Sequence, residues 1–72
     1  MAAQEFAVRG AYIQLDQLLK VLGLCSSGGA AHAAVAEGLV RVDGALEKRK
    51  RAKLRPGQRL EFAGEIITLV AA

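Results

Sequence analysis

The segment LVRVDGALE, residues 39–47, carries the strongest local signal in the chain. Val40 and Val42 alternate with Arg41, which is the pattern of a strand with one buried face. Asp43-Gly44 then supplies a two-residue turn of the kind that favours a tight β-hairpin. The segment therefore predicts two short antiparallel strands joined at residues 43–44, with Arg41 on the exposed side.

Two helices are predicted on the N-terminal side of this hairpin. In YIQLDQLLKVLG, residues 12–23, leucines recur with helical spacing, and Gly23 suits a left-handed stop. CSSGGAAHAAVAEG, residues 25–38, reads as a second helix that Ser26 or Ser27 can cap and Gly38 can end. Its small alanine side chains would let the two helices pack closely.

Further strands are predicted on both sides of the helices. QEFAVRG, residues 4–10, reads as a short strand, while RLEFAG (59–64) and EIITLVAA (65–72) read as strands joined by an Ala63-Gly64 turn. RPGQ, residues 55–58, fits a turn with Pro56 at its second position and Gly57 at its third. The predicted fold class is α+β, with two packed helices followed by a small antiparallel β-sheet.

Length and composition restrict the organisation further. Seventy-two residues predict one domain, residues 1–72, with a small core because such a chain buries only about 60% of its unfolded surface. The lone cysteine, Cys25, permits no intrachain disulfide and is expected to be a small buried hydrophobe. We find no signal-peptide pattern and no membrane span, so a cytoplasmic protein is expected.

Charge is concentrated in one segment of the chain. Residues 48–55, here called the basic segment, hold six cations and no carboxylate, whereas the remainder carries four cations against seven carboxylates. Clustered lysines and arginines bind closely spaced phosphates because their neutralisation releases condensed counterions. An acidic protein partner, an anionic lipid surface and a merely solubilising loop are alternatives, but the segment lacks the amphipathic helical pattern that lipid binding favours. The cations are Lys48, Arg49, Lys50, Arg51, Lys53 and Arg55.

The order of these features resembles the RNA-binding domain first described in small-subunit ribosomal protein four, which contains the alpha-L RNA-binding motif. The likeness runs from about residue 13 to residue 70 and is closest to small stand-alone bacterial members. Members often carry basic residues just after the serine that caps the second helix and one turn later, where this chain has Gly28 and His32. The matching residues are Leu15, Leu18, Ser27, Ala31, Val35, Gly38, Val40, Val42, Asp43, Gly44 and Gly57.

The resemblance implies RNA binding on the face formed by the second helix and the hairpin. Ser27 and Gly28 would present helix-start amides to a phosphate, although an ordinary cap and turn explains the same residues. His32 would touch RNA or be a plain surface side chain, and Arg41 would join the same face. Because the chain has only three aromatic residues, recognition is expected to read RNA shape rather than stacked bases.

The predicted function is therefore an RNA-binding module that recognises structured RNA through backbone phosphates. By family analogy the RNA is ribosomal or transfer RNA, and a monomer with ribosome association is expected. The alternative is a protein-interaction module for an acidic partner. We predict no catalysis, cofactor or metal site, since one Cys and one His supply neither a zinc ligand set nor a convincing nucleophile.

Overall fold

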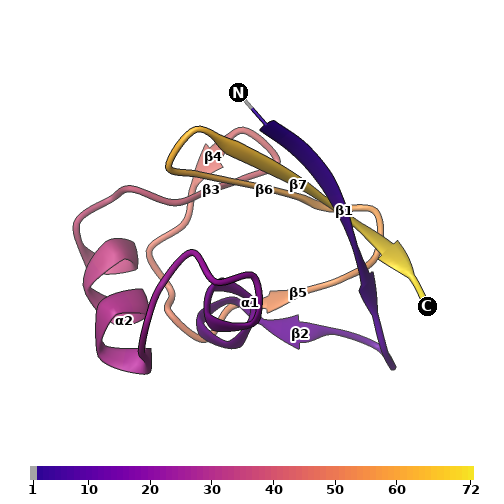
Figure 1. Cartoon of the computed structure of the whole chain (residues 1–72), viewed down its shortest axis with the longest axis horizontal. Helices are drawn as coiled ribbons and strands as arrows, with labels where there is room; N and C mark the ends of the chain where they lie inside the picture. The colour runs from indigo at the N-terminus through magenta and orange to yellow at the C-terminus, as the bar shows by residue number, and fades with distance from the viewer. Residues whose placement is uncertain (1) are drawn as a thin grey trace.

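Five strands form one sheet in the order β1-β7-β6-β3-β4, and a two-stranded sheet, β2-β5, lies beside the two helices (Figure 1). The computed structural model describes residues 2–72. The large sheet covers one side of the helices, so the predicted α+β class is confirmed. The strands are β1 (Ala2–Val8), β2 (Ile13–Gln14), β3 (Arg41–Val42), β4 (Ala45–Leu46), β5 (Lys53–Leu54), β6 (Arg59–Phe62) and β7 (Glu65–Ala71), and the helices are α1 (Leu15–Val21) and α2 (Gly28–Ala36).

Both predicted two-residue turns are present. Asp43 and Gly44 have φ values of 53° and 82°, and Ala63 and Gly64 have φ values of 55° and 80°. Positive φ at both central residues defines the type I′ turn, whose twist matches that of the flanking strands. These turns connect β3 to β4 and β6 to β7, and β3 also pairs antiparallel with β6.

Asp43 fixes the β3–β4 hairpin to β6 with its side chain. Its Oδ1 accepts a hydrogen bond from the Arg59 N–H at 2.9 Å, and its Oδ2 accepts one from Gln58 Nε2 at 3.2 Å. The Asp43 N–H in turn donates to the Arg59 carbonyl at 2.8 Å. The aspartate thus holds the turn and also joins two hairpins that are separate in the sequence.

One strand pairing differs from the predicted antiparallel sheet. β1 runs parallel to β7, with Ala2 opposite Glu65 and Val8 opposite Ala71. Parallel neighbours need a long crossover connection, and here nearly the whole domain supplies it. The alternation in residues 4–10 predicted a strand, but it carried no information on the partner or on its direction.

The helices are shorter than predicted. Residues 13–14 form β2, which pairs with β5, so α1 begins at Leu15 rather than near residue 12. The second helix begins at Gly28, because Ser27 takes the N-cap position and its hydroxyl accepts a hydrogen bond from the Ala30 N–H. Gly38, with φ of 75°, follows the end of α2 as predicted.

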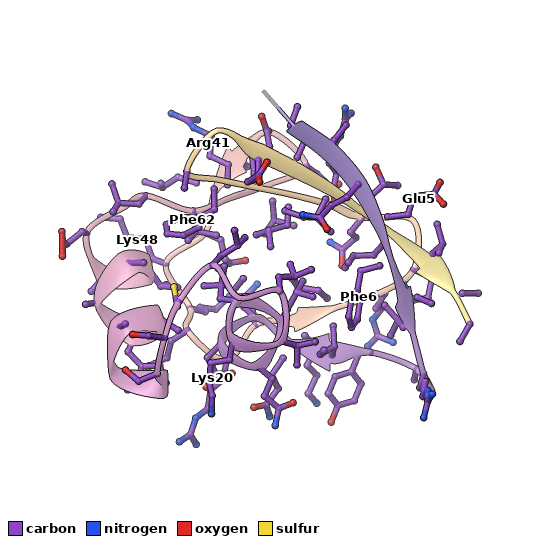
Figure 2. All side chains as sticks on the ribbon, in the orientation of Figure 1. Glu5, Phe6, Lys20, Arg41, Lys48 and Phe62 are labelled. Atoms are coloured by element: carbon purple, nitrogen blue, oxygen red, sulfur yellow. The ribbon has the colours of Figure 1, made fainter. Side chains whose placement is uncertain are left out.

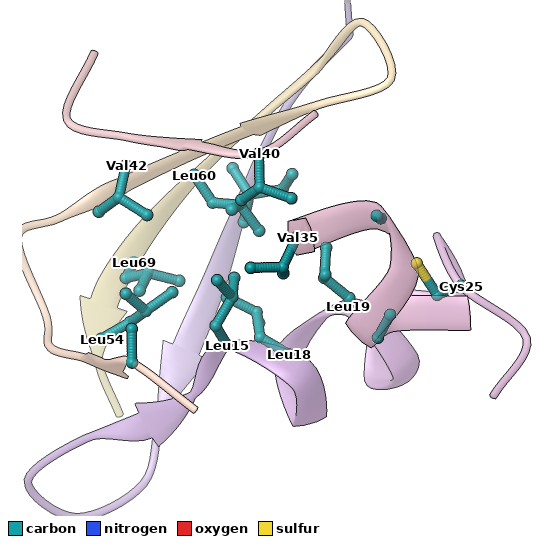
Figure 3. Packing of buried hydrophobic residues seen from close by; sticks show 14 of the residues in the cluster. Leu15, Leu18, Leu19, Cys25, Val35, Val40, Val42, Leu54, Leu60 and Leu69 are labelled. Carbon is teal, nitrogen blue, oxygen red and sulfur yellow. The ribbon is translucent and has the colours of Figure 1, made fainter. Parts of the chain in front are cut away.

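The core lies between the helices and the large sheet (Figure 3). Leu15, Leu18 and Leu19 of α1 are fully buried, while Leu22 is only partly buried against the core. Cys25 is buried as expected, and Phe62 is half-buried rather than fully inward. The other buried apolar residues are Val8, Ala31, Ala34, Val35, Val40, Val42, Ala52, Leu54, Leu60, Ile67 and Leu69. Neither helix in residues 2–72 has the length and apolar character needed to cross a membrane.

We predict that Asp43→Ala lowers the free energy of unfolding by about 1–2 kcal/mol, because two hydrogen bonds are lost and alanine tolerates positive φ poorly. Asp43→Asn is the matched control, since it keeps an acceptor for the Arg59 N–H and accepts positive φ. Urea denaturation of the three proteins measures the difference. Equal stability of the alanine variant and the wild type would contradict this role of Asp43.

Candidate functional site

The basic segment is an ordered part of the fold and not a free loop. It begins just after Glu47, whose N–H donates to the Val40 carbonyl at 3.0 Å, and it includes β5. Ala52 and Leu54 are buried in the core, with exposed fractions of 6% and 2%. These two apolar anchors hold the segment against the helices, while all six of its cationic side chains remain exposed.

The start of α1 is bonded to the backbone of the basic segment. The N-cap residue Gln14 makes no capping hydrogen bond with its side chain. Instead, the Leu15 N–H donates to the Ala52 carbonyl at 2.9 Å and the Asp16 N–H donates to the Lys50 carbonyl at 3.0 Å. The first amides of a helix lack partners within the helix, and here the basic segment supplies them. Helix α1 and the basic segment are thereby tied together.

Arg49 is paired within its own segment of chain. Its Nε and Nη2 lie 3.2 and 3.4 Å from the Glu47 carboxylate, and its backbone N–H donates to the same carboxylate at 3.0 Å. Hydrogen bonds from the Arg49 side chain hold the pKa of the Glu47 carboxyl below its usual value. Arg49 therefore differs from the other cations of the basic segment, because a phosphate that binds Arg49 must share it with Glu47.

His32 and Asp16 connect the two helices close to Arg51. His32 Nε2 lies 3.0 Å from Asp16 Oδ2, and the His32 side chain is about one-third exposed (33%). Burial opposes the charge on Asp16, but the hydrogen bonds from His32 and from the Gln17 N–H, with the charge of Arg51 nearby, lower the pKa of its carboxyl. His32 is thus neither isolated nor a plain surface side chain, since Asp16 holds it beside the basic segment.

Lys53 and Arg55 differ in their surroundings. Lys53 Nζ lies 5.0 Å from the centroid of the Tyr12 ring, within the range of a cation–π interaction. The Arg55 backbone N–H donates to Gln58 Oε1 at 2.8 Å, and its side chain is exposed.

A surface hollow of about 380 Å³ is lined by Arg49, Arg51, Ala52 and Lys53. Three of the predicted cations therefore converge on one hollow.

At the start of α2, the Ser27 hydroxyl is already used as a cap, accepting from the Ala30 N–H at 3.1 Å. Gly28 is not required by packing, because a Cβ built at this position meets no atom within 4 Å. The space beside Gly28 is therefore open.

Arg41 does not join the start of α2. Val42 faces the core, so Arg41 points to the opposite face of the large sheet, where its cross-strand partner is Glu61. Figure 2 shows Arg41 on the upper side of the sheet, whereas α2 begins at the lower side of the molecule in the same orientation (Figure 1). The predicted grouping of Arg41 with Ser27 and His32 is wrong, because strand alternation turns Arg41 away from the helices.

The groups that could support catalysis or metal binding lie apart. The Cys25 thiol is buried, and burial raises its pKa, which disfavours the reactive thiolate. His32 contacts Asp16, whereas Asp43 is engaged with Arg59 and Gln58. Among residues 2–72, no three His, Cys, Asp or Glu side chains are grouped so that they could hold a metal ion.

Three residues around the basic segment escaped the sequence analysis: Asp16, Glu47 and Tyr12. The spacing of Glu47 and Arg49 was visible in the sequence and could have indicated their pairing. No sequence signal links Asp16 to His32 or Tyr12 to Lys53, since the packing of separate elements brings these pairs together.

Comparison with known proteins identifies the fold. Residues 6–70 match the S4 domain family. The chain belongs to this family. The resemblance inferred from the helices, the serine cap and the hairpin is therefore confirmed.

Two curated relatives cover most of the chain. A protein of Escherichia coli (strain K12), named "Putative RNA-binding protein YbcJ", is 48% identical over 60 residues, which are 83% of this chain and 86% of the relative. "Uncharacterized protein YbcJ" of Shigella flexneri matches with the same identity and coverage. The solution structure of YbcJ from E. coli superposes with a TM-score of 0.68 and 44% identity, covering 99% of this chain and 89% of that one. It is described as revealing an αL motif involved in RNA-binding.

We predict that Asp16→Asn lowers the free energy of unfolding at pH 7 by less than about 1 kcal/mol, as expected for a charged group near the surface whose hydrogen-bond acceptor is kept. Asparagine keeps an acceptor for His32 and Gln17, so the variant removes mainly the charge. A carboxyl whose pKa is lower in the folded state than in the unfolded state stabilises the protein at pH values above the unfolded-state pKa, which is near 4. That contribution is lost as the pH falls through the folded-state pKa. Urea denaturation from pH 7 to about pH 2 should therefore show the two proteins converging in acid, and a constant difference would contradict the assignment.

Proposed function

We propose that this chain binds structured RNA through backbone phosphates, with the basic segment as the main contact. The observation that carries the proposal is the anchoring of that segment. Its carbonyls cap α1 and its apolar residues enter the core, so its cations are displayed on a backbone that the fold holds in place. Binding then requires little further ordering of the chain, and less of the electrostatic gain is lost to conformational entropy.

Family membership and the αL motif support RNA as the polyanion. The matched relative from E. coli is named for RNA binding, and its solution structure is described in the same terms. We propose ribosomal or transfer RNA as the class, by analogy with the family and not from any contact. No observation in the structure favours an acidic protein partner over RNA, and a binding role without catalysis is proposed.

Charge placement supports a one-sided mode of binding. The basic segment concentrates six cations, while the remainder of the chain is net acidic, so a polyanion is steered to one side. The Asp16–His32 pair and Glu47 lie beside these cations and partly offset them. We infer that Arg49 contributes least, because it is the one cation of the basic segment that an ion pair among residues 2–72 engages. Lys48, Lys50, Arg51, Lys53 and Arg55 are in no such pair.

The sharpest test compares two variants that each remove two cations. Lys50→Ala/Arg51→Ala removes charge from the basic segment and keeps the backbone carbonyl that caps α1. Arg41→Ala/Arg59→Ala removes the same charge from the outer face of the sheet and serves as the control. Affinity for a structured RNA is measured over a range of salt concentrations, for example by fluorescence anisotropy.

We expect the variant in the basic segment to weaken RNA binding and to reduce the slope of log affinity against log salt by about two, one for each lost phosphate contact. The sheet variant should keep the wild-type slope. Equal losses in the two variants would show that net charge alone drives binding. Absence of wild-type RNA binding at low salt would overturn the proposed function.

A gain-of-function variant tests the contribution of α2. Gly28→Lys places a cation in open space just after the Ser27 cap, whereas Gly28→Ala is the matched control that changes only helix propensity. Both substitutions should stabilise α2 by up to about 1 kcal/mol relative to glycine. We predict that only the lysine variant binds RNA more tightly, roughly by the effect of one added phosphate contact, as a salt titration would measure. Identical affinities of the two variants would place the start of α2 outside the RNA interface.

A further inference from the structure

A second hollow lies where the chain turns back after β1. It has a volume of about 570 Å³ and is lined by Phe6, Ala7, Arg9, Tyr12, Ile13 and Gln17. Gly10, with φ of 80°, lies between the two sides of this turn. Figure 2 shows Phe6 projecting from β1 toward the β2–β5 pair. The turn thus brings two of the three aromatic side chains of the protein to one hollow.

The rings in this hollow are accessible and lie beside cations. Tyr12 is 40% exposed, and Phe6 is partly buried against the core. Arg9 lines the hollow, and Lys53 Nζ lies 5.0 Å from the centroid of the Tyr12 ring. The six lining residues include no carboxylate. The site therefore combines flat apolar surface with positive charge, which suits a planar group attached to an anion.

Lys53 connects this hollow to the basic segment. This lysine lines the hollow formed with Arg49 and Arg51, and its ammonium group also lies over Tyr12. A nucleic acid strand whose phosphates contact Arg51 and Lys53 would therefore carry its next nucleotide toward Tyr12. The contact between Lys53 and Tyr12 thus places the two hollows on either side of the β2–β5 pairing.

We propose that the hollow lined by Phe6, Arg9 and Tyr12 receives an unpaired base of the bound RNA, which stacks on the Tyr12 ring. The inference rests on the proposed function and adds the part of the RNA that is recognised: a single-stranded nucleotide next to a duplex. Every base has a flat π-face, so stacking on Tyr12 tolerates any sequence. Arg9 and Lys53 would hold the phosphates on either side of that nucleotide. The small number of aromatic residues predicted that the protein reads RNA shape alone. Stacking on Tyr12 adds a contact with one base.

The test compares a blunt-ended RNA duplex, which has no unpaired nucleotide, with duplexes of the same sequence that carry a short unpaired stretch at a 5′ end, at a 3′ end or as a bulge. We expect Tyr12→Ala to weaken binding of at least one RNA with unpaired nucleotides by roughly tenfold, the typical effect of losing one base–aromatic stack. Binding of the blunt duplex should not change. Tyr12→Phe is the matched control, because it keeps the ring, and it should bind all of these RNAs like the wild type.

Intrinsic fluorescence supplies a readout that does not depend on any variant. Tyr12 is the only tyrosine and the chain has no tryptophan, so the emission reports on this site alone. An RNA with unpaired nucleotides should quench Tyr12 more than the blunt duplex does at equal saturation. Equal quenching by all RNAs, or equal affinity losses for all RNAs in Tyr12→Ala, would overturn the inference while RNA binding itself remained. If the wild type binds none of these RNAs, the proposed function and this inference fail together.

Discussion

The hydrogen bonds from the first amides of α1 to the carbonyls of the basic segment are the constraint on which the structure of the site depends. Leu15 and Asp16 donate to Ala52 and Lys50, so a helix without a capping side chain obtains its partners from a strand-forming segment far along the chain. The same bonds turn those carbonyls toward the helix. The cationic side chains of the segment consequently remain at the surface, in a fixed relation to α1 and, through Asp16 and His32, to α2.

Two carboxylates of this arrangement lie close to the charges of the basic segment. Six cations in eight residues repel one another, but Glu47 binds Arg49 and the Asp16 carboxylate lies close to Arg51. Each carboxylate has a lowered pKa, because it accepts hydrogen bonds that stabilise its charged form and lies close to positive charge. The remaining cations are free to meet a polyanion, and the partial neutralisation limits the cost of holding them together.

The parts of the fold that local chemistry determines could be predicted from the sequence. In Asp43-Gly44 and in Ala63-Gly64 a glycine takes the second of the two positive-φ positions, and Ser27 caps α2 as its pattern indicates. The parallel pairing of β1 with β7 could not be predicted, since strand alternation does not specify a partner. Because the pairing of β3 was not known from the sequence, Arg41 was predicted to lie on the same face as the start of α2. The register of β3 turns Arg41 to the other face of the sheet. The presence of only three aromatic residues argued against base stacking. The sequence did not show that the turn at Gly10 brings Tyr12 and Phe6 to the same hollow.

Amide hydrogen exchange in the free protein tests the central claim most directly. If the basic segment is bonded to α1 as described, the Leu15 and Asp16 N–H groups should exchange as slowly as amides in the middle of α1, because they open only when the domain unfolds. Exchange at these two amides as fast as in an unstructured peptide, with the rest of α1 protected, would contradict the account. The basic segment would then be a mobile loop whose order is acquired only on binding.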